Sequence, residues 1–154
     1  MLRRCEHHNV TSVAFHLPVA DKLAYTCRLL RKAVTRGSRL VVTGAPDTLA
    51  QLDLALWTFS ATEFVPHCQA DAVDGVLRRS AVVLAETPAV VDALPGILIN
   101  LGSQVPEGFE RFERVIEVVT GDDDDRQWAR QRWKHYTQAG FPPVKFDMDQ
   151  RTTA

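Results

Sequence analysis

Three cationic residues in the last third of the chain recur at four-residue steps: Arg126, Arg130 and Lys134. Side chains four residues apart share one face of an α-helix, so this spacing predicts a basic ridge. Trp133 lies one position before Lys134 and three after Arg130, which places an indole close to that ridge. Guanidinium and ammonium groups bind carboxylates, while an apolar notch can take a hydrophobic side chain. The pattern therefore favours a ligand that is both acidic and hydrophobic.

A purely structural interpretation of this segment also stands, and composition alone favours it. The buried stripe of a helix could be formed by Trp128, Ala129, Trp133 and Tyr136, with the cations as its solvated face. The acidic run at residues 122–125 could suggest magnesium. We favour a structural role for it, because carboxylates at a helix start complement the helix dipole and cap free N–H groups, whereas magnesium sites usually need substrate phosphates as co-ligands.

A second candidate region combines a helix end with the loop that follows it. Trp57 ends an apolar helical segment, and Phe64 and Pro66 follow shortly after it. Large aromatic side chains near loop ends can anchor protein interfaces. Burial in the core is the more common fate of each such residue alone. Pattern alone leaves both interpretations open here.

Nucleotide binding and hydrolase chemistry find little support in the loops. The loop at residues 43–47 reads TGAPD and the loop at residues 18–21 reads PVAD. Neither matches the glycine-rich motifs whose backbone N–H groups cradle phosphates, and no lysine is placed to reach them. The serines lack the GxSxG arrangement of a nucleophile elbow. An α/β enzyme or nucleotide-binding protein of unrelated role stays as the alternative hypothesis, on fold analogy alone.

Metal binding is also weakly supported. Cys5, His7 and His8 cluster ahead of the first expected strand, where a solvated extension is the simpler interpretation. His67 and Cys68 are adjacent, whereas zinc ligands usually have spacer residues that let their side chains converge. We therefore expect no metal, no cofactor and no catalytic activity.

The elements that must position these residues alternate in type. Residues 13–17 form an apolar run ended by Pro18 and predict a strand. An amphipathic helix follows, with Asp21 as its N-cap and Gly37 as its stop. Strand, helix, strand, helix at the start predicts parallel βαβ units in an α/β layer fold. Further elements are expected as strands at 39–43, 81–85, 97–101, 115–119 and 144–146, a short strand or ordered loop at 63–67, a brief helix at 109–114, and helices at 46–57 and 122–139.

Size and composition are those of one globular domain without a secretion signal. The chain has 154 residues and a formal net charge of −1, which argues against a nucleic-acid footprint over the whole surface. DNA would be reached through a local patch or another protein. An odd number of cysteines, three, does not suggest a disulfide framework. No apolar run is long enough for a membrane span or signal peptide, so we expect a cytoplasmic protein.

Two segments resemble the chi subunit family of DNA polymerase III: LDLALWTFSATEFVPH at residues 52–67 and WARQRWKHYTQAGF at residues 128–141. The resemblance spans roughly residues 13–148, which leaves an N-terminal extension at residues 1–12 and a tail at residues 149–154. It implies a three-layer αβα fold with a mostly parallel sheet, similar to Rossmann-type folds but without a nucleotide site. It also implies a non-catalytic accessory subunit that acts in DNA replication.

Members of that family bind the acidic, phenylalanine-ended C-terminal tail of single-stranded-DNA-binding protein, and they bind the psi subunit, which tethers chi to the clamp loader. By position, the resemblance implies that Arg130 and Lys134 contact tail carboxylates. Trp133 takes the place of an aromatic beside them, where a tyrosine would be expected, and Val119 helps to line the apolar notch. Arg126 extends the same ridge. The partner surface for psi would contain Trp57, Phe64 and Pro66.

Overall fold

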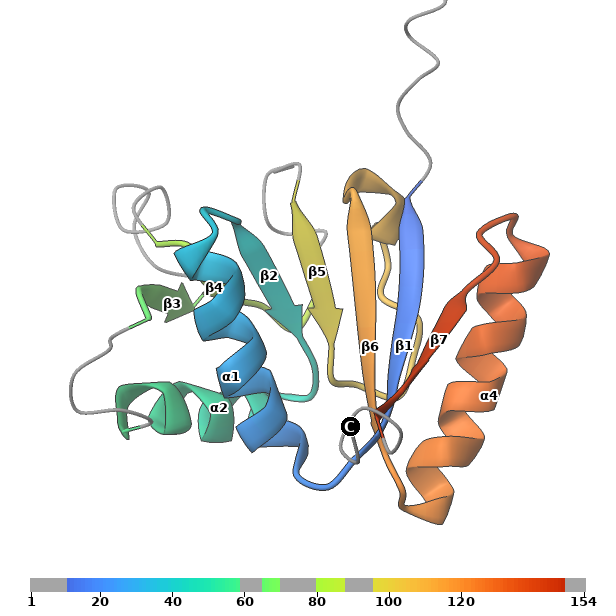
Figure 1. The fold of residues 1–154 in the computed structure, drawn as a ribbon, viewed down its shortest axis with the longest axis horizontal. Helices are drawn as coiled ribbons and strands as arrows, with labels where there is room; N and C mark the ends of the chain where they lie inside the picture. Colours follow the sequence, from blue (N-terminus) through green and yellow to red (C-terminus); the bar gives the residue numbers. More distant parts are fainter. Residues whose placement is uncertain (1–10, 59–64, 70–79, 88–95, 149–154) are drawn as a thin grey trace, which may run out of the picture.

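A computed structural model describes residues 11–58, 65–69, 80–87 and 96–148 of the chain, and its elements alternate between strands and helices (Figure 1). In chain order they are β1 (Ser12–Val19), α1 (Lys22–Thr35), β2 (Leu40–Thr43), α2 (Pro46–Thr58), β3 (His67–Gln69), β4 (Val82–Leu84), β5 (Ile97–Asn100), the 3-10 helix η3 (Phe109–Arg111), β6 (Arg114–Thr120), α4 (Asp123–Gln138) and β7 (Val144–Asp147).

All described strands belong to one sheet in the order β3-β4-β2-β5-β6-β1-β7. Every strand pair is parallel. The first strand lies near the far edge, between β6 and β7, so the beginning and the end of the domain are neighbours in space (Figure 1). The expected mostly parallel α/β sheet is therefore confirmed.

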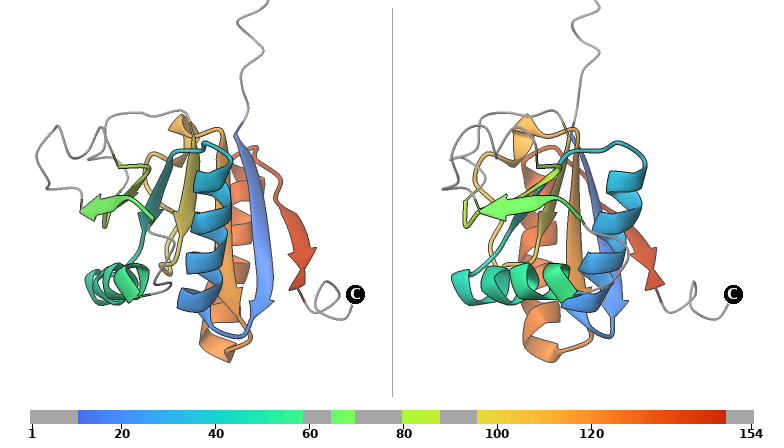
Figure 2. Two further views of the ribbon diagram at one scale, coloured as in Figure 1. Left: turned by 60° about the vertical axis from the view of Figure 1, so that its left-hand side comes forward. Right: turned by 90° about the vertical axis from the view of Figure 1, so that its left-hand side faces the viewer.

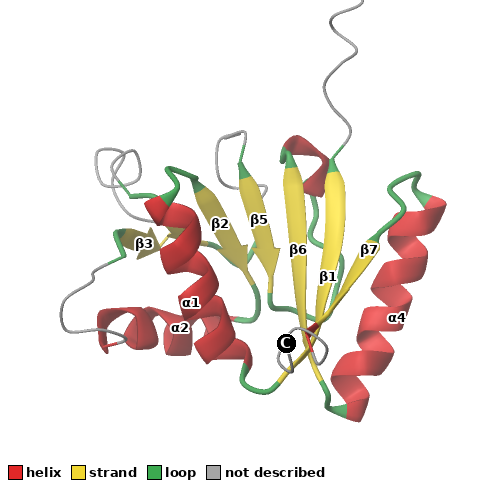
Figure 3. Ribbon diagram, viewed as in Figure 1, coloured by secondary structure: helices red, strands yellow, loops and turns green. Residues whose placement is uncertain are grey.

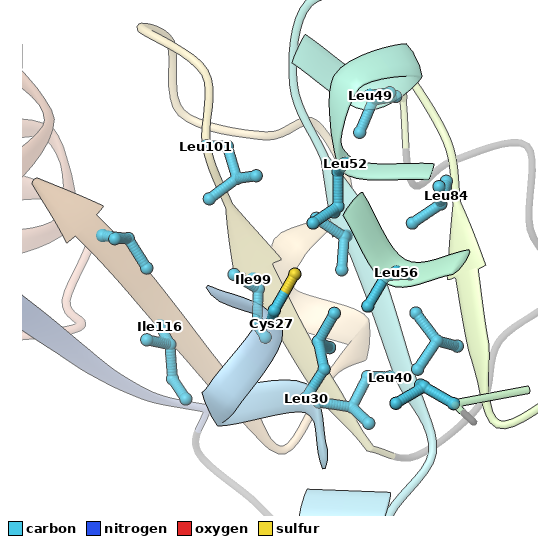
Figure 4. Packing of buried hydrophobic residues seen from close by; sticks show 14 of the residues in the cluster. Cys27, Leu30, Leu40, Leu49, Leu52, Leu56, Leu84, Ile99, Leu101 and Ile116 are labelled. Atoms are coloured by element: carbon cyan, nitrogen blue, oxygen red, sulfur yellow. The ribbon is translucent and has the colours of Figure 1, made fainter. Parts of the chain in front are cut away.

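Helices cover both faces of this sheet, which makes three layers. On one face, α1 and α2 pack side chains such as Cys27, Leu30 and Leu52 against the strands, with Ile99 and Ile116 opposite them (Figure 4). On the other face, α4 and η3 pack against a second cluster, and Figure 2 shows α1 and α4 on opposite sides of the sheet. Parallel strands buried on both faces are expected to read as continuous apolar runs, and β2 and β4 do so. The expected three-layer αβα fold is confirmed.

The ends of α1 follow the residues that the sequence marks for them. The Asp21 carboxylate accepts a hydrogen bond from the Ala24 backbone N–H at 3.0 Å, as an N-cap should. Gly37 has φ of 84°, a left-handed conformation that a residue with a side chain adopts only with strain. The N-cap and the stop predicted for this helix are both confirmed.

Two local predictions were wrong. The first strand does not end at Pro18 but continues to Val19, with an irregular register between His16 and Val19 because proline has no N–H to donate to the ladder. At α4, the side chain of the N-cap residue Asp122 makes no capping hydrogen bond. A different carboxylate of the acidic run, Asp125, is the one that is buried.

The first described residue, Thr11, is bonded to a distant part of the chain. Thr11 is already buried, and its hydroxyl donates to the Glu110 carbonyl at 3.1 Å and to the Phe112 carbonyl at 2.6 Å. Thr11 is thus held against the segment that leads from η3 to β6. Residues 1–10, which include Cys5, His7 and His8, and residues 149–154 lie outside the described residues. Within the described ranges, no helix is long and apolar enough to cross a membrane.

Candidate functional site: the basic ridge of the last helix

The outer face of α4 carries the basic ridge, defined here as Arg126, Arg130 and Lys134. All three side chains are exposed to solvent. Among the described residues, none of the three side chains forms a hydrogen bond or an ion pair. Their four-residue spacing keeps them on one side of the helix, because α4 runs unbroken from Asp123 to Gln138. The ridge is therefore a row of cations whose charge is available to a ligand.

Trp133 lies between the ridge and the core. Its indole is half-buried and packs on Phe15 of β1, with ring centroids 5.0 Å apart. Leu17, two residues further along β1, is half-buried against the same core cluster. Apolar surface thus remains accessible beside the cations. Val119 of β6 is different, since it is 0% exposed, and it supports this region from below without reaching the surface.

The inner face of α4 holds a buried polar cluster that the sequence analysis did not identify: Asn100, Glu117, Arg132 and Tyr136. The Arg132 side chain is 2% exposed and its Nε donates to the Glu117 carboxylate at 2.9 Å. The Tyr136 hydroxyl donates to the same carboxylate at 2.6 Å, and the Asn100 amide at 3.0 and 3.1 Å. Arg132 Nη1 also donates to the Ser103 carbonyl at 3.2 Å. The cluster joins α4, β5 and β6 in one network.

Burial and charge set the protonation of this cluster. Burial raises the pKa of Glu117, and the Arg132 guanidinium and the hydrogen bonds from Tyr136 and Asn100 oppose that rise. For Tyr136, burial and the neighbouring Glu117 carboxylate both raise the pKa, so its hydroxyl stays protonated as the donor. The geometry is that of a carboxylate surrounded by donors and a paired guanidinium. A buried ion pair of this kind fixes the position of α4 against the sheet.

A second set of buried interactions, made by Asp125, fixes the start of α4. Asp125 accepts hydrogen bonds from the Thr120 N–H at 2.8 Å and from the Thr120 hydroxyl at 3.0 Å, and it pairs with Lys22 of α1 at 3.1 Å. Burial alone would raise the pKa of Asp125, but these hydrogen bonds and the Lys22 ammonium outweigh it and hold the pKa below its usual range. Part of the acidic run is thereby used to anchor the helix. Its neighbours Asp123 and Asp124 point to solvent.

The second candidate region lies at the other end of the sheet, on α2 and β3. Trp57 is 58% exposed and Leu54 is 65% exposed, which makes them the largest apolar surfaces of α2. Pro66 is half-buried just before β3. The rings of Trp57 and His67 are in edge contact, with their centroids 5.2 Å apart. Phe64, the remaining residue expected here, falls outside the described residues.

Gly44 and His67, which lie in the segments considered for nucleotide and metal binding, both have structural roles. A side chain at Gly44 would come within 3.3 Å of Leu101 Cβ, so the glycine lets the ends of β2 and β5 approach each other. His67 bonds the Val65 carbonyl at 2.7 Å and the Asp53 carboxylate at 3.0 Å, which accounts for both ring nitrogens. Among the residues with described positions, no group of three or more His, Cys, Asp or Glu side chains is placed to hold a metal.

Comparison with known proteins decides the family. The family model described as "DNA polymerase III chi subunit, HolC" matches residues 10–144. The chain belongs to the DNA polymerase III chi subunit family. A chi subunit from Pseudomonas aeruginosa is 33% identical over 138 residues, which cover 86% of this chain and 94% of the relative. The chi subunit of Escherichia coli K12 is 30% identical over 116 residues, covering 75% and 78% respectively. This confirms the resemblance that the two segments indicated.

Within this chi fold, the sequence-predicted residues fall into two separate surfaces. Arg126, Arg130 and Lys134 lie together on α4 with Trp133, whereas Trp57 and Pro66 lie at the β3 edge of the sheet. The inner cluster was missed, although a signal was available. Arg132 precedes Tyr136 by four residues and follows Ala129 by three, so it falls on the buried stripe and not on the ridge. A lone cation on such a stripe indicates a buried acidic partner.

Proposed function

We propose that this chain is a non-catalytic adaptor of the DNA polymerase III holoenzyme. It binds the acidic C-terminal tail of single-stranded-DNA-binding protein on the basic ridge, and it reaches the clamp loader through a psi subunit held at the surface formed by Leu54, Trp57 and Pro66. It would work in the cytoplasm, meet DNA only indirectly, and require no cofactor.

One observation carries the tail-binding proposal. The three ridge cations are exposed and have no ion-pair partner among the described residues, and they stand beside a half-buried indole. A tail made of consecutive carboxylates and one terminal aromatic residue needs both features at once. Cations alone would bind any anion, and a partly accessible indole alone would bind any apolar group. The combination selects a peptide that ends in an apolar residue next to acidic ones.

The interior arrangement refines which atoms form the notch. Because Val119 is fully buried, the accessible apolar surface comes from Trp133 and Leu17. Val119 acts by filling the space beneath them. We therefore propose that a change at Val119 alters the tail site indirectly, by shifting Trp133, and that direct contact belongs to Trp133.

The expected affinity follows from the number of charges. Each charge-assisted hydrogen bond contributes about 1.5–3 kcal/mol, so two or three together with the apolar contact give a dissociation constant in the micromolar range. Exposed charges are screened by salt. Binding should therefore weaken steadily as the salt concentration rises from about 0.05 to 0.5 M.

The test uses a fluorescent peptide that carries the tail sequence of the single-stranded-DNA-binding protein from the same genome. Its anisotropy is titrated with the wild-type chain, with Arg130→Ala and with Lys134→Ala. Each variant should weaken binding by about tenfold, which corresponds to about 1.4 kcal/mol. Gln131→Ala is the matched control, since it is an exposed uncharged residue on the same helix, and it should bind like the wild type. Equal affinity for all four proteins would reject the assigned site.

The psi proposal has a separate test. Co-expression of the chain with a psi subunit should give one co-eluting complex in size-exclusion chromatography. Trp57→Glu places a charge in the largest apolar surface of α2 and should remove the complex. The ridge variant Lys134→Ala should keep it. Loss of the complex in both variants, or in neither, would contradict two independent surfaces.

A further inference from the structure

The β7 edge of the sheet lacks a described helix on the α1 side. Within the described ranges, α1 and α2 stand towards the β3 edge of this face, and β7 at the opposite edge has no helix in front of it (Figure 3). Helix α1 still reaches β6 and β1, since its Tyr25 hydrogen-bonds His16. All-parallel sheets are normally covered on both faces, because their strands are apolar on both sides. Phe146 of β7 keeps part of its side chain exposed there.

A long groove occupies this position. It has a volume of about 1210 Å³ and runs beside α1, from Asp21 at one end to Ser38 at the other. Its floor is apolar and is formed by residues of the sheet and of α1, among them Leu29, Ile97 and Phe146. The 14 residues of α1 are about 21 Å long, so the groove has the length of a helix of about four turns.

The rim of this groove is strongly basic. Arg28 and Lys32 of α1 and its C-cap residue Arg36 follow one another at four-residue steps, and Arg114 stands at the start of β6 on the same groove. All four side chains are exposed. Arg31 also lines the groove, whereas the acidic residue on its lining is Asp21, which caps the far end of α1. On a chain with a formal net charge of −1, this is a local concentration of positive charge.

We propose that the groove is a second docking surface, which binds an acidic amphipathic helix of a partner protein. The helix would lay its apolar side on the floor and its carboxylates against Arg28, Lys32, Arg36 and Arg114. It would thereby lie beside α1, towards the β7 edge that no described helix covers. The match rests on length, on the apolar floor and on charge.

A helix fits this surface better than a nucleic acid does. Single strands are usually held by aromatic faces on which bases stack. Here the rings pack on one another. The ring plane of His16 makes an angle of 79° with that of Tyr25 and of 80° with that of Phe146. A hydrogen bond of 2.6 Å also joins His16 to the Tyr25 hydroxyl. Between the cations the floor is largely aliphatic. That floor suits leucine-like side chains.

This surface is independent of the tail site proposed above. The groove lies on the α1 face of the sheet, and the basic ridge lies on α4, which covers the opposite face. Variants of the two surfaces can therefore be compared in one experiment. The ridge variant Arg130→Glu/Lys134→Glu removes any contribution of the tail site. The groove variant Arg28→Glu/Lys32→Glu reverses two exposed charges that no described ion pair uses.

The experiment measures anisotropy of a labelled 18-residue amphipathic peptide, with leucines on one face and glutamates on the other. In the ridge-variant background, the peptide should bind and the groove variant should weaken binding at least about tenfold. A matched peptide with lysine in place of glutamate should not bind. With the ridge intact, binding of the single-stranded-DNA-binding protein tail should be unchanged by the groove variant.

Four outcomes would overturn the proposal. The acidic peptide could fail to bind, or bind equally well to the groove variant. A labelled 18-nucleotide oligo(dT) could bind with the same dependence on Arg28 and Lys32, which would make the groove a nucleic-acid surface. Sedimentation could show a dimer of the wild-type chain that the groove variant abolishes, which would make the occupant a second copy. Circular dichroism of each variant confirms that the fold is retained.

Discussion

Arg130 and Arg132 lie two residues apart on the same helix and have opposite environments. Arg130 is exposed and has no ion-pair partner among the described residues, whereas Arg132 is 2% exposed and paired with Glu117. A step of two residues turns the helix by about 200°, which is enough to move a side chain from solvent to core. The comparison shows that a cation's role on α4 depends on its face and not on its residue type.

The two faces also differ in the energy that each side chain contributes. A buried ion pair is costly to break, because removing one member leaves the other charged and without a partner in the interior. An exposed cation contributes little to folding, so its charge is retained for a ligand. The inner face should therefore control stability, and the outer face should control binding.

The largest expected effect is that of Arg132→Met on stability. Loss of the guanidinium leaves Glu117 in the interior without its cation, which should lower the free energy of unfolding by about 3–5 kcal/mol. Urea denaturation followed by circular dichroism measures it. The double variant Glu117→Leu/Arg132→Met should cost less than Arg132→Met alone, since no unpaired charge remains. An Arg132→Met cost below about 1 kcal/mol would contradict the structural role of the pair.

Trp133 should link the two faces, because it packs on Phe15 and also borders the ridge. Trp133→Ala should lower the free energy of unfolding by roughly 2 kcal/mol, less than for a fully buried aromatic residue, and should also weaken tail binding. Trp133→Phe keeps an aromatic ring and should retain most of the stability and most of the affinity for the tail. Thermal unfolding and peptide anisotropy on the same samples separate the two effects. A loss of stability without any change in affinity would remove Trp133 from the tail site.

The anchor at the start of α4 should make stability depend on pH. The folded-state pKa of Asp125 is lowered, so its contribution is present above the unfolded value of about 4 and is lost as pH falls through the folded value. Asp125→Asn should therefore cost about 1–2 kcal/mol at pH 7, and the difference from the wild type should shrink below pH 4. Asp124→Asn, an exposed neighbour, is the control. A difference that stays constant down to pH 2 would mean that the carboxylate charge is not what matters.

The smallest expected effect is that of the ridge on folding. Arg130→Ala and Lys134→Ala should each change the free energy of unfolding by no more than about 0.5 kcal/mol, because both side chains are exposed and unpaired among the described residues. Urea denaturation at matched ionic strength measures this. A loss above about 1.5 kcal/mol in either variant would end the distinction between the two faces.

Much of the fold could be predicted because its signals are local. The N-cap at Asp21 and the stop at Gly37 depend on neighbouring residues, and the apolar runs of β2 and β4 depend on burial from both sides. Strand order is different. Nothing local in residues 12–19 indicates that β1 lies between β6 and β7, because that position is set by pairing across the whole chain.

The candidate site was predictable to the same extent. Helical spacing was sufficient to group Arg126, Arg130 and Lys134, since period alone determines which residues share a face. Helical spacing could not predict that Val119 is fully buried, because its burial depends on how α4 and β6 pack. It also missed the partner of Arg132, because Glu117 comes from a strand and is brought near only by the tertiary fold.

The position of β1 also bears on how the chain is made. Thr11, just before β1, bonds carbonyls 99 and 101 residues further along, and β1 itself pairs with β6 and β7. During synthesis the first strand must wait for nearly all of the domain to leave the ribosome before it has a partner on either side. Nascent chains should thus stay protease-sensitive until late in translation, and chains released before β6 should be substrates for chaperones.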